Sequence, residues 1–233
     1  MSHTEALPSS FQLPEDTPNN SENAMSDEVV FSKMDSKKKK RRQKHKRSVP
    51  VPTNRVGALK KDWQAIYLPI VEKLHLDIRY NTKKNIVEIR TNKNAPKIEI
   101  DGRELDPAKA IQKAADFVNA YVLGFELKDI VCLLRQDDFY VDSFKVNDVK
   151  YLSGDHLGRA IGRVAGAKGS TLFVIQNTTK TRIVLANDQV HILGKVTNIN
   201  HAKRAVCDLI LGAPPGSVYN RLKVLSARQK ESF

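Results

Sequence analysis

The sequence is poor in cysteine, and it contains no apolar run of membrane-spanning length. Its two cysteines, Cys132 and Cys207, each lie in an apolar helical pattern, and neither belongs to a C-x-x-C pair or a Cys/His cluster. We therefore expect buried thiols in a reducing compartment, without a metal site or a disulfide framework. Because no signal peptide and no bilayer-spanning stretch can be recognised, no membrane is expected as a partner.

Aromatic side chains are also scarce. They make up 6% of the chain, which argues against an RRM-type sheet on which bases stack. Acidic residues are outnumbered, since 39 Lys and Arg against 26 Asp and Glu give a net charge of +13. This excess favours a polyanion as partner, and nucleic acid before a membrane surface.

The charge is unevenly divided along the chain. Residues 1–36 hold seven acids and one base and are rich in Ser, Asn and Pro, which predicts a disordered segment. Residues 37–47 are a dense cationic run, and 48–233 still carry a net charge of +10. The run is either a solvated linker or a nuclear-import signal with non-specific RNA contact, and we favour the signal. The signal would comprise Lys37, Lys38, Lys39, Lys40, Arg41 and Arg42.

A glycine loop between two predicted helices is the most informative local pattern. Apolar residues at helical spacing run from Leu157 to Val164, Gly-Ala-Lys-Gly follows at 166–169, and a second helical pattern covers Thr171 to Gln176. The glycines allow the backbone to approach a ligand closely, and the second helix offers unpaired N–H groups at its start. Lys168 adds a positive charge. KH modules hold about four nucleotides with such a G-x-x-G loop.

The glycine pair alone is weak evidence, because glycine is also an ordinary C-cap of a helix. The order of elements strengthens it, since helix, loop, helix, strand, strand and helix follow one another in a block of domain size. A phosphate-binding P-loop is excluded. Residues 162–170 lack the G-K-[S/T] ending, and a helix precedes the loop where a strand is required.

The same order of elements is predicted twice, near residues 55–123 and near 138–212. The first copy has Leu68-Pro69-Ile70 where the glycine loop would stand. It is therefore either a KH-like unit that has become free to bind protein or a structural support for its neighbour, and the sequence leaves both open. The predicted fold class is α+β, with two tandem KH-like domains behind a disordered acidic and basic N-terminal tail.

Local signals define the domain boundaries and several helix ends. Asp106 and Pro107 predict the start of a long helix that Gly124 ends, and Asp155 predicts the cap of the helix before the glycine loop. A C-terminal extension would dock either on a domain or on a partner. The predicted domains are a tail at 1–50, a KH-like domain without G-x-x-G plus a connector helix at 51–136, a KH domain at 137–213, and the extension at 214–233.

Four sequence blocks in combination resemble one family. They are GRAIGRVAGAKG at 158–169, TRIVLAN at 181–187, VHILG at 190–194 and AKRAVCDLILGAPPGSVYNRL at 202–222. Residues 55–233, together with the acidic and basic style of the tail, resemble the partner-of-Nob family, also called the Dim-type KH proteins of eukaryotic ribosome assembly. The resemblance implies two KH-type domains packed side by side, of which only the second keeps a working G-x-x-G loop.

The resemblance also implies a function. Members of the family are non-catalytic factors, so we expect no catalytic residue, no metal ligand and no cofactor. The implied partners are pre-rRNA near the 3′ end of the small-subunit rRNA and the PIN-domain endonuclease of the small subunit, together with nascent small-subunit proteins and assembly factors. The implied location is the nucleus and nucleolus, with late small-subunit precursors in the cytoplasm as a further place.

The RNA-binding role carries over by position to a small set of residues. The loop has Ala167 where lysine often follows the first glycine in the family, so Lys168 and the helix arginines are expected to share the phosphate contact. An apolar groove between the helices and the strand beginning at Thr181 would accommodate bases. The predicted contacts are the loop residues Gly166, Ala167, Lys168 and Gly169, the cations Arg159, Arg163, Lys180 and Arg182, and the groove residues Ile161, Val164 and Ile183.

Other functions remain open at this point. The cluster Asp137, Asp138 and Asp142 is compatible with a metal nuclease, although a turn leading into a strand explains it more simply. A KRR-type scaffold of the small-subunit processome would also pair two KH units. An exosome cap subunit is disfavoured, because too little strand is predicted before residue 138 for its S1-like barrel. Three histidines without spaced metal-ligand partners are expected at the surface or an interface: His156, His191 and His201.

Overall fold

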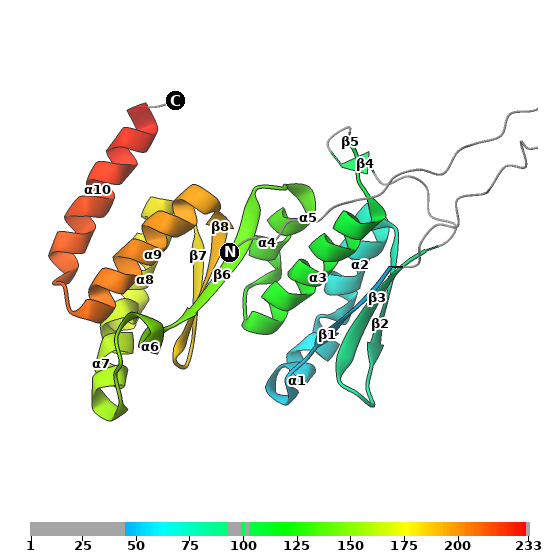
Figure 1. Ribbon diagram of the computed structural model, residues 1–233, viewed down its shortest axis with the longest axis horizontal. Coiled ribbons are helices and arrows are strands. Elements are labelled where there is room, and N and C mark those ends of the chain that lie inside the picture. The colour runs from blue at the N-terminus through cyan, green and yellow to red at the C-terminus, as the bar shows by residue number, and fades with distance from the viewer. Residues whose placement is uncertain (1–44, 93–98, 101–102, 232–233) are drawn as a thin grey trace, which may run out of the picture. The chain divides into compact units, whose positions relative to one another are not determined.

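The computed structural model describes residues 45–92, 99–100 and 103–231. The predicted tail at 1–36 and the import signal at 37–42 therefore lie outside the described residues. In the described residues, helices alternate with antiparallel strands, which form two three-stranded sheets and one two-stranded sheet (Figure 1). The α+β class is confirmed. Within the described ranges, no helix is long and apolar enough to cross a membrane.

The first sheet places β3 (Ile86–Thr91) between β1 (Lys46–Pro50) and β2 (Leu76–Asn81), and both neighbours run antiparallel to it. The side-chain oxygen of Asn81 accepts a hydrogen bond from the backbone N–H of Lys83 at 3.2 Å. Asn85 takes the left-handed conformation, with φ 51°. The turn between Asn81 and Asn85 therefore joins β2 to β3.

Strand β1 differs from the prediction, which assigns all residues up to 50 to the tail. Lys46 and Arg47, the end of the basic run, lie in this strand, and only Val49 of its five residues is buried. Lys46 forms an ion pair with Glu88 of β3 at 3.3 Å. A hydrogen bond from Arg79, supported by Lys46, keeps the pKa of Glu88 below its usual value. Because it pairs with β3, the end of the basic run forms a β-strand.

Three helices cover the first sheet: α1 (Thr53–Lys61), α2 (Trp63–Leu74) and α3 (Pro107–Leu123). Helix α3 begins after Asp106 with proline at its first position and ends at Gly124, whose φ is 111°, as its flanking residues predict. A two-stranded ribbon, β4 (Glu99–Ile100) and β5 (Arg103–Glu104), precedes it. The core between sheet and helices includes the fully buried Leu59, Ile66, Ile70, Leu74, Ile89, Ile111 and Phe117.

The predicted connector helix is two short helices, α4 (Leu127–Ile130) and α5 (Cys132–Arg135). Cys132 lies at the start of α5, where its thiol donates a hydrogen bond to the carbonyl of Asp129. Cys132 and Cys207 are half-buried rather than fully buried. Burial raises the pKa of both thiols, so both stay protonated at neutral pH.

The second sheet repeats the order of the first. Strand β8 (Gln189–Lys195) lies between β6 (Phe139–Lys145) and β7 (Arg182–Ala186), again antiparallel to both. The helices of this half are α6 (Val146–Val149), α7 (Gly154–Ala165), α8 (Ser170–Thr179), α9 (Val196–Leu211) and α10 (Pro215–Glu231). The N-cap of helix α7 is Ser153, two residues before the cap predicted at Asp155.

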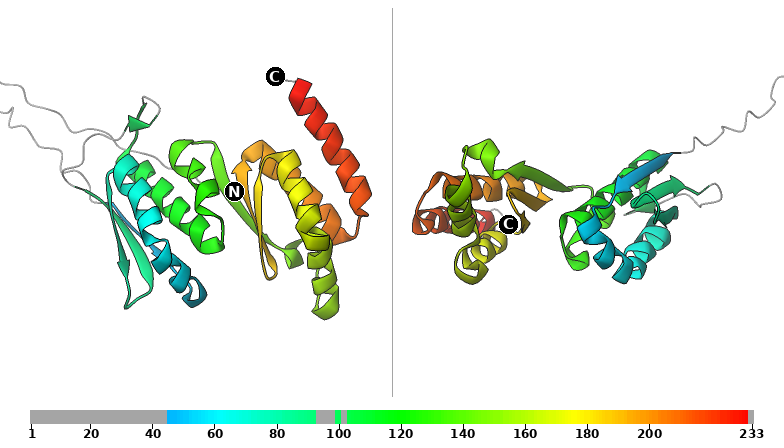
Figure 2. Two further views of the ribbon diagram at one scale, coloured as in Figure 1. Left: turned by 180° about the vertical axis from the view of Figure 1, so that it is seen from behind. Right: turned by 90° about the horizontal axis from the view of Figure 1, so that it is seen from below.

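The second half has its own core. Residues of β7, β8 and helices α7, α8 and α9 pack together (Figure 2), and α10 adds Val218 and Leu222, which are 1% and 2% exposed. The opposite face of the sheet contributes Leu193 and Val184 to the core of the first half. The described residues accordingly belong to one compact unit.

Candidate nucleic-acid interface

The predicted glycine loop joins α7 to α8 as a single 3-10 turn, Ala167–Gly169. The backbone N–H of Gly166 still donates to the carbonyl of Gly162 at 2.8 Å, so the turn starts where α7 ends. Gly166, Lys168 and Gly169 all have positive φ, at 74°, 52° and 79°. Three such residues within four reverse the chain tightly and expose the start of α8.

The two glycines have different roles. A Cβ at Gly166 would lie 2.2 Å from Oγ1 and 2.7 Å from the backbone N of Thr171, whereas a Cβ at Gly169 would meet nothing within 4 Å. Gly166 is therefore required by packing inside the loop. Gly169 has open space where a Cβ would stand, which leaves room there for the close approach of a ligand that the sequence predicts.

The start of α8 is available to an anion. Its N-cap is Gly169, which supplies no side-chain hydrogen bond, and its first turn holds no acidic residue. The unpaired N–H groups and the positive end of the helix dipole favour negative charge at this point. Lys168 is exposed beside them and makes no ion pair with another described residue. The loop thus combines main-chain donors with a mobile cation.

The C-terminal extension supports the loop from the protein side. Thr171, in the first turn of α8, is 3% exposed, and its hydroxyl accepts a hydrogen bond of 2.9 Å from the phenol of Tyr219 on α10. Because Gly166 packs directly against Thr171, the contact links α10 to the loop through one residue. Sequence reasoning missed Thr171 and Tyr219, which stand 48 positions apart.

The two predicted arginines of α7 face different surroundings. Arg159 is exposed. Arg163 donates from Nε to the carbonyl of Leu209 at 3.1 Å and from Nη2 to that of Ile210 at 3.3 Å. These carbonyls lie in the last turn of α9, where a cation stabilises the helix. Arg163 therefore has a structural task, and a phosphate contact would have to use its remaining N–H groups.

The two predicted cations at the strand entry lie beyond the far end of α8. Lys180 follows the last residue of this ten-residue helix, so about 15 Å of helix separates it from the loop. Lys180 is exposed, whereas Arg182 forms an ion pair of 2.9 Å with Asp129 of α4. Lys180, Asp129 and Arg182 line a hollow of about 410 Å³. A strand of about four nucleotides is long enough to reach from the loop to this end.

The apolar residues predicted to line a groove are mostly core residues. Val164 is 1% exposed and Ile183 is 5% exposed, and both belong to the core of the second half. For these two the structure gives an interior position, so their contact with a base would require the core to open. Ile161 is half-buried against the same core and keeps surface for a ligand.

Two exposed aromatic residues lie in the second half of the protein, one on the helix that follows the loop and one in the segment before α7. Phe173 of α8 is 66% exposed, and Tyr151, which precedes α7, is 85% exposed. The aromatic content of the chain gave no signal for them, because stacking depends on where a ring lies rather than on how many there are. Ser170, Phe173 and Asn177 form the exposed face of α8, and the exposed Lys180 follows the end of this helix.

The first half has a different junction between its paired helices. Helices α1 and α2 are separated by Asp62 alone, so Leu68-Pro69-Ile70, predicted to replace the glycine loop, lie inside α2. The carboxylate of Asp62 accepts a hydrogen bond of 2.7 Å from Tyr121. Burial, followed by this bond, raises the pKa of Tyr121 to about 12. A carboxylate at the junction disfavours a nearby phosphate, and a one-residue junction has no open main-chain turn.

The acidic cluster does not converge on one point. Asp137 pairs with Lys113 and Asp142 pairs with Lys203, and the described residues contain no group of three or more potential metal ligands. Of the three histidines predicted at the surface or an interface, His191 is not at the surface, since it is 2% exposed and its Nδ1 lies 2.7 Å from Oγ of Ser143. Burial lowers the pKa of His191.

Comparison with known proteins identifies related sequences over most of the chain. A family model described as a eukaryotic-type KH domain (KH-domain type I) matches residues 143–227. The RNA-binding protein pno1 of Dictyostelium discoideum is 54% identical over 187 residues, which cover 80% of this chain and 74% of that protein. The pre-rRNA-processing protein PNO1 of Debaryomyces hansenii is 50% identical over 187 residues, which cover 80% and 69%.

Solved archaeal structures share the fold. Dim2p in the complex of a/eIF2alpha, aDim2p and rRNA from Pyrococcus horikoshii superposes with a TM-score of 0.65 at 26% identity, over 79% of this chain and 96% of that one. A protein of unknown function from Aeropyrum pernix gives a TM-score of 0.67 at 25% identity, over 82% and 95%. The order of elements seen here is thus shared with a chain that was solved together with rRNA.

Proposed function

The chain belongs to the PNO1 family of RNA-binding, pre-rRNA-processing KH-domain proteins, and from this premise we propose that its loop at 166–169 grips single-stranded pre-rRNA near the 3′ end of the small-subunit rRNA. The family acts by binding RNA and not as an enzyme. The protein therefore contributes to ribosome biogenesis by holding a substrate rather than by cutting it.

The mode of binding follows from the geometry of the loop. One phosphate lies at the N-terminus of α8, where the main-chain N–H groups and Lys168 meet. The following nucleotides run along α8 toward Lys180, with Arg159 as a further cation. Bases meet the exposed ring of Phe173 and the half-buried Ile161. Since most contacts are to phosphate, affinity falls steeply with salt and sequence preference is modest.

The observation that carries this proposal is the open side of Gly169 next to an unpaired Lys168 at a helix start that no side chain caps. It is tested by fluorescence anisotropy with a labelled single-stranded oligonucleotide from the rRNA 3′ region. Lys168→Glu should weaken binding about tenfold and reduce the salt slope by about one. Lys83→Glu, an exposed lysine in the β2–β3 turn, changes the charge equally and should leave affinity within about twofold. Equal losses in both variants would leave only net charge as the explanation.

The two halves are proposed to be tandem KH-like domains packed side by side, near 46–136 and 137–213, the first including strand β1 in addition to the predicted 51–136. Their sheets share one strand order, and their helix pairs and long helices follow in the same sequence. The carboxylate of Asp62 at the α1–α2 junction supports a first half that does not bind phosphate. The first half is then free for protein contact, and we assign to it the PIN-domain endonuclease as partner.

This partnership defines the biological step. With the second half on the RNA and the first half on the nuclease, the protein recruits or positions the PIN-domain endonuclease for the final maturation cut, on a nascent small subunit that carries other assembly factors. The basic run at 37–42 directs the chain to the nucleus and nucleolus. Co-purification is the test, since late small-subunit precursors together with the nuclease are expected and early processome particles alone would refute the assignment.

A further inference from the structure

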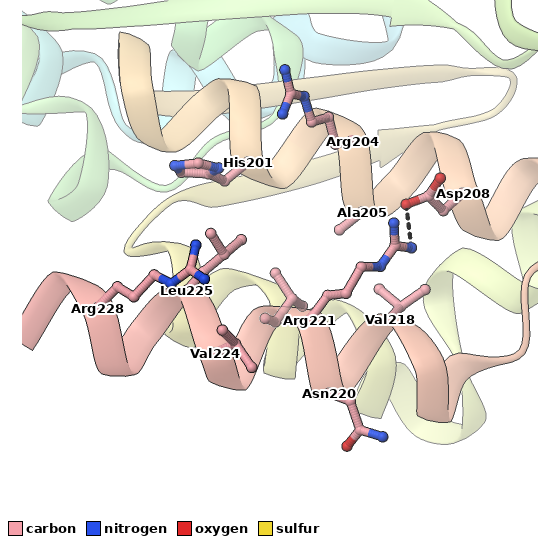
Figure 3. Close-up of a pocket in the computed structure, with 11 residues that line it drawn as sticks. His201, Arg204, Ala205, Asp208, Val218, Asn220, Arg221, Val224, Leu225 and Arg228 are labelled. Atoms are coloured by element: carbon pink, nitrogen blue, oxygen red, sulfur yellow. Dashed lines mark hydrogen bonds and ion pairs between the residues drawn. The ribbon is translucent and has the colours of Figure 1, made fainter.

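Helices α9 and α10 enclose a groove of about 450 Å³ that the proposed RNA-binding loop does not use (Figure 3). The two helices form a hairpin joined at Gly212, Ala213 and Pro214. An ion pair between Asp208 of α9 and Arg221 of α10 bridges them. The groove therefore has two helical walls held at a fixed spacing by their own side chains.

The lining of the groove is apolar. Val218 and Leu222 of α10 are almost fully buried, and Ala205 of α9 is 5% exposed. Val224, by contrast, is 51% exposed although it lines the groove. Leu225, also on α10, is half-buried. Together they give a hydrophobic lining with an exposed anchor point, which is the surface that an apolar side chain of a partner would cover.

The rim of the groove is cationic. Asp208 is the one carboxylate among the lining residues, and Arg221 neutralises it. Arg204 of α9 and Arg228 of α10 also line the groove, are exposed, and make no ion pair with any described residue. The groove thus carries unpaired positive charge on both walls around an apolar lining.

This combination selects one class of ligand. A phosphodiester strand would use the arginines and leave the apolar lining uncovered, whereas an acidic amphipathic helix would use both. Its apolar residues at i, i+3, i+4 and i+7 would pack on Val224 and Leu225, and its carboxylates would pair with Arg204 and Arg228. We propose that the α9–α10 groove is a docking site for an acidic amphipathic helix of a partner protein.

The test uses the full chain and a defined library of peptides. Helix-forming 16-residue peptides, randomised at four apolar and four charged positions, are selected on the immobilised protein. The best are then measured by anisotropy against wild type, Val224→Asp, Arg228→Glu and Lys223→Glu. Lys223 is exposed on α10 but does not line the groove, so its reversal matches the charge change at Arg228.

Selected peptides should be acidic and apolar at helical spacing. Val224→Asp and Arg228→Glu should each weaken their binding about tenfold, and Lys223→Glu should change it by less than about twofold. Affinity for the rRNA oligonucleotide should stay unchanged in all three variants. The proposal is overturned if selection yields basic peptides or none that depend on Val224, or if Arg228→Glu weakens RNA binding and leaves peptide binding intact. Because RNA binding is measured separately, a failure of peptide binding would not contradict the RNA-binding function proposed for the loop.

Discussion

Replacing Gly166 by alanine should cost far more stability than replacing Gly169, although both glycines belong to the same loop. At Gly166 the backbone has φ 74° and ψ 175°, a region that only glycine adopts easily, which costs alanine about 1–3 kcal/mol. The added Cβ would also lie 2.2 Å from Oγ1 of Thr171, and such overpacking costs about 1–3 kcal/mol more. Gly166→Ala should therefore lower the free energy of unfolding by about 2–6 kcal/mol.

Gly169→Ala is the matched control. Its φ of 79° and ψ of 10° are in the left-handed helical region, and the new Cβ meets nothing, so the cost is about 1–2 kcal/mol. Urea unfolding followed by far-UV circular dichroism measures both variants. The only tryptophan, Trp63, lies in α2, so its fluorescence reports the first half and shows whether both halves unfold together. Equal destabilisation by the two variants would refute the assignment of Gly166 to internal packing.

Three further predictions concern groups that support the loop or the sheet beneath it. Arg163→Ala removes two charge-assisted bonds to the end of α9 and should lower the unfolding free energy by about 1.5–3 kcal/mol in urea melts; no loss would mean that those bonds are not formed in solution. Tyr219→Phe removes the hydrogen bond to Thr171 and should cost about 0.5–1.5 kcal/mol and weaken RNA binding a few-fold, whereas Tyr151→Phe, at an 85% exposed ring, should change neither. Because burial lowers the pKa of His191 from its ordinary 6.5, the unfolded chain binds its proton more readily, and stability present above about pH 6.5 is lost as pH falls. Thermal melts from pH 7.5 to 5 should therefore show a steeper loss in wild type than in His191→Gln, and parallel curves would contradict this.

Elements specified by neighbouring residues were predictable from the sequence. Helix α3 begins at Pro107, whose fixed φ suits the first helical position, and ends at Gly124, which takes the left-handed conformation. The glycine loop was predicted for the same reason, since residues with positive φ in a short turn are preferentially glycine. The fold class and the order of elements followed from these local signals and from hydrophobic periodicity.

Features that depend on distant partners were not predictable. Strand β1 has a single buried side chain and exists through its pairing with β3, about 40 positions away. The junction at Asp62 has φ −95° and ψ 10°, in the bridge region, which requires neither glycine nor proline. The residue types there gave no sign of a junction, and the prediction placed it at Leu68-Pro69-Ile70 instead. Likewise, the sequence around Arg163 does not show that this side chain is hydrogen-bonded, because its partners are carbonyls of α9, far along the chain.

The most direct test of the central claim is a chemical-shift map of the backbone amides as a short single-stranded RNA from the rRNA 3′ region is added. If the main chain of the loop grips phosphate, the largest shifts fall on the N–H groups of residues 167–172, at the turn and the start of α8. The amides around Asp62, at the matching junction of the first half, should not move. Large shifts at Asp62 with an unmoved glycine loop would contradict the account.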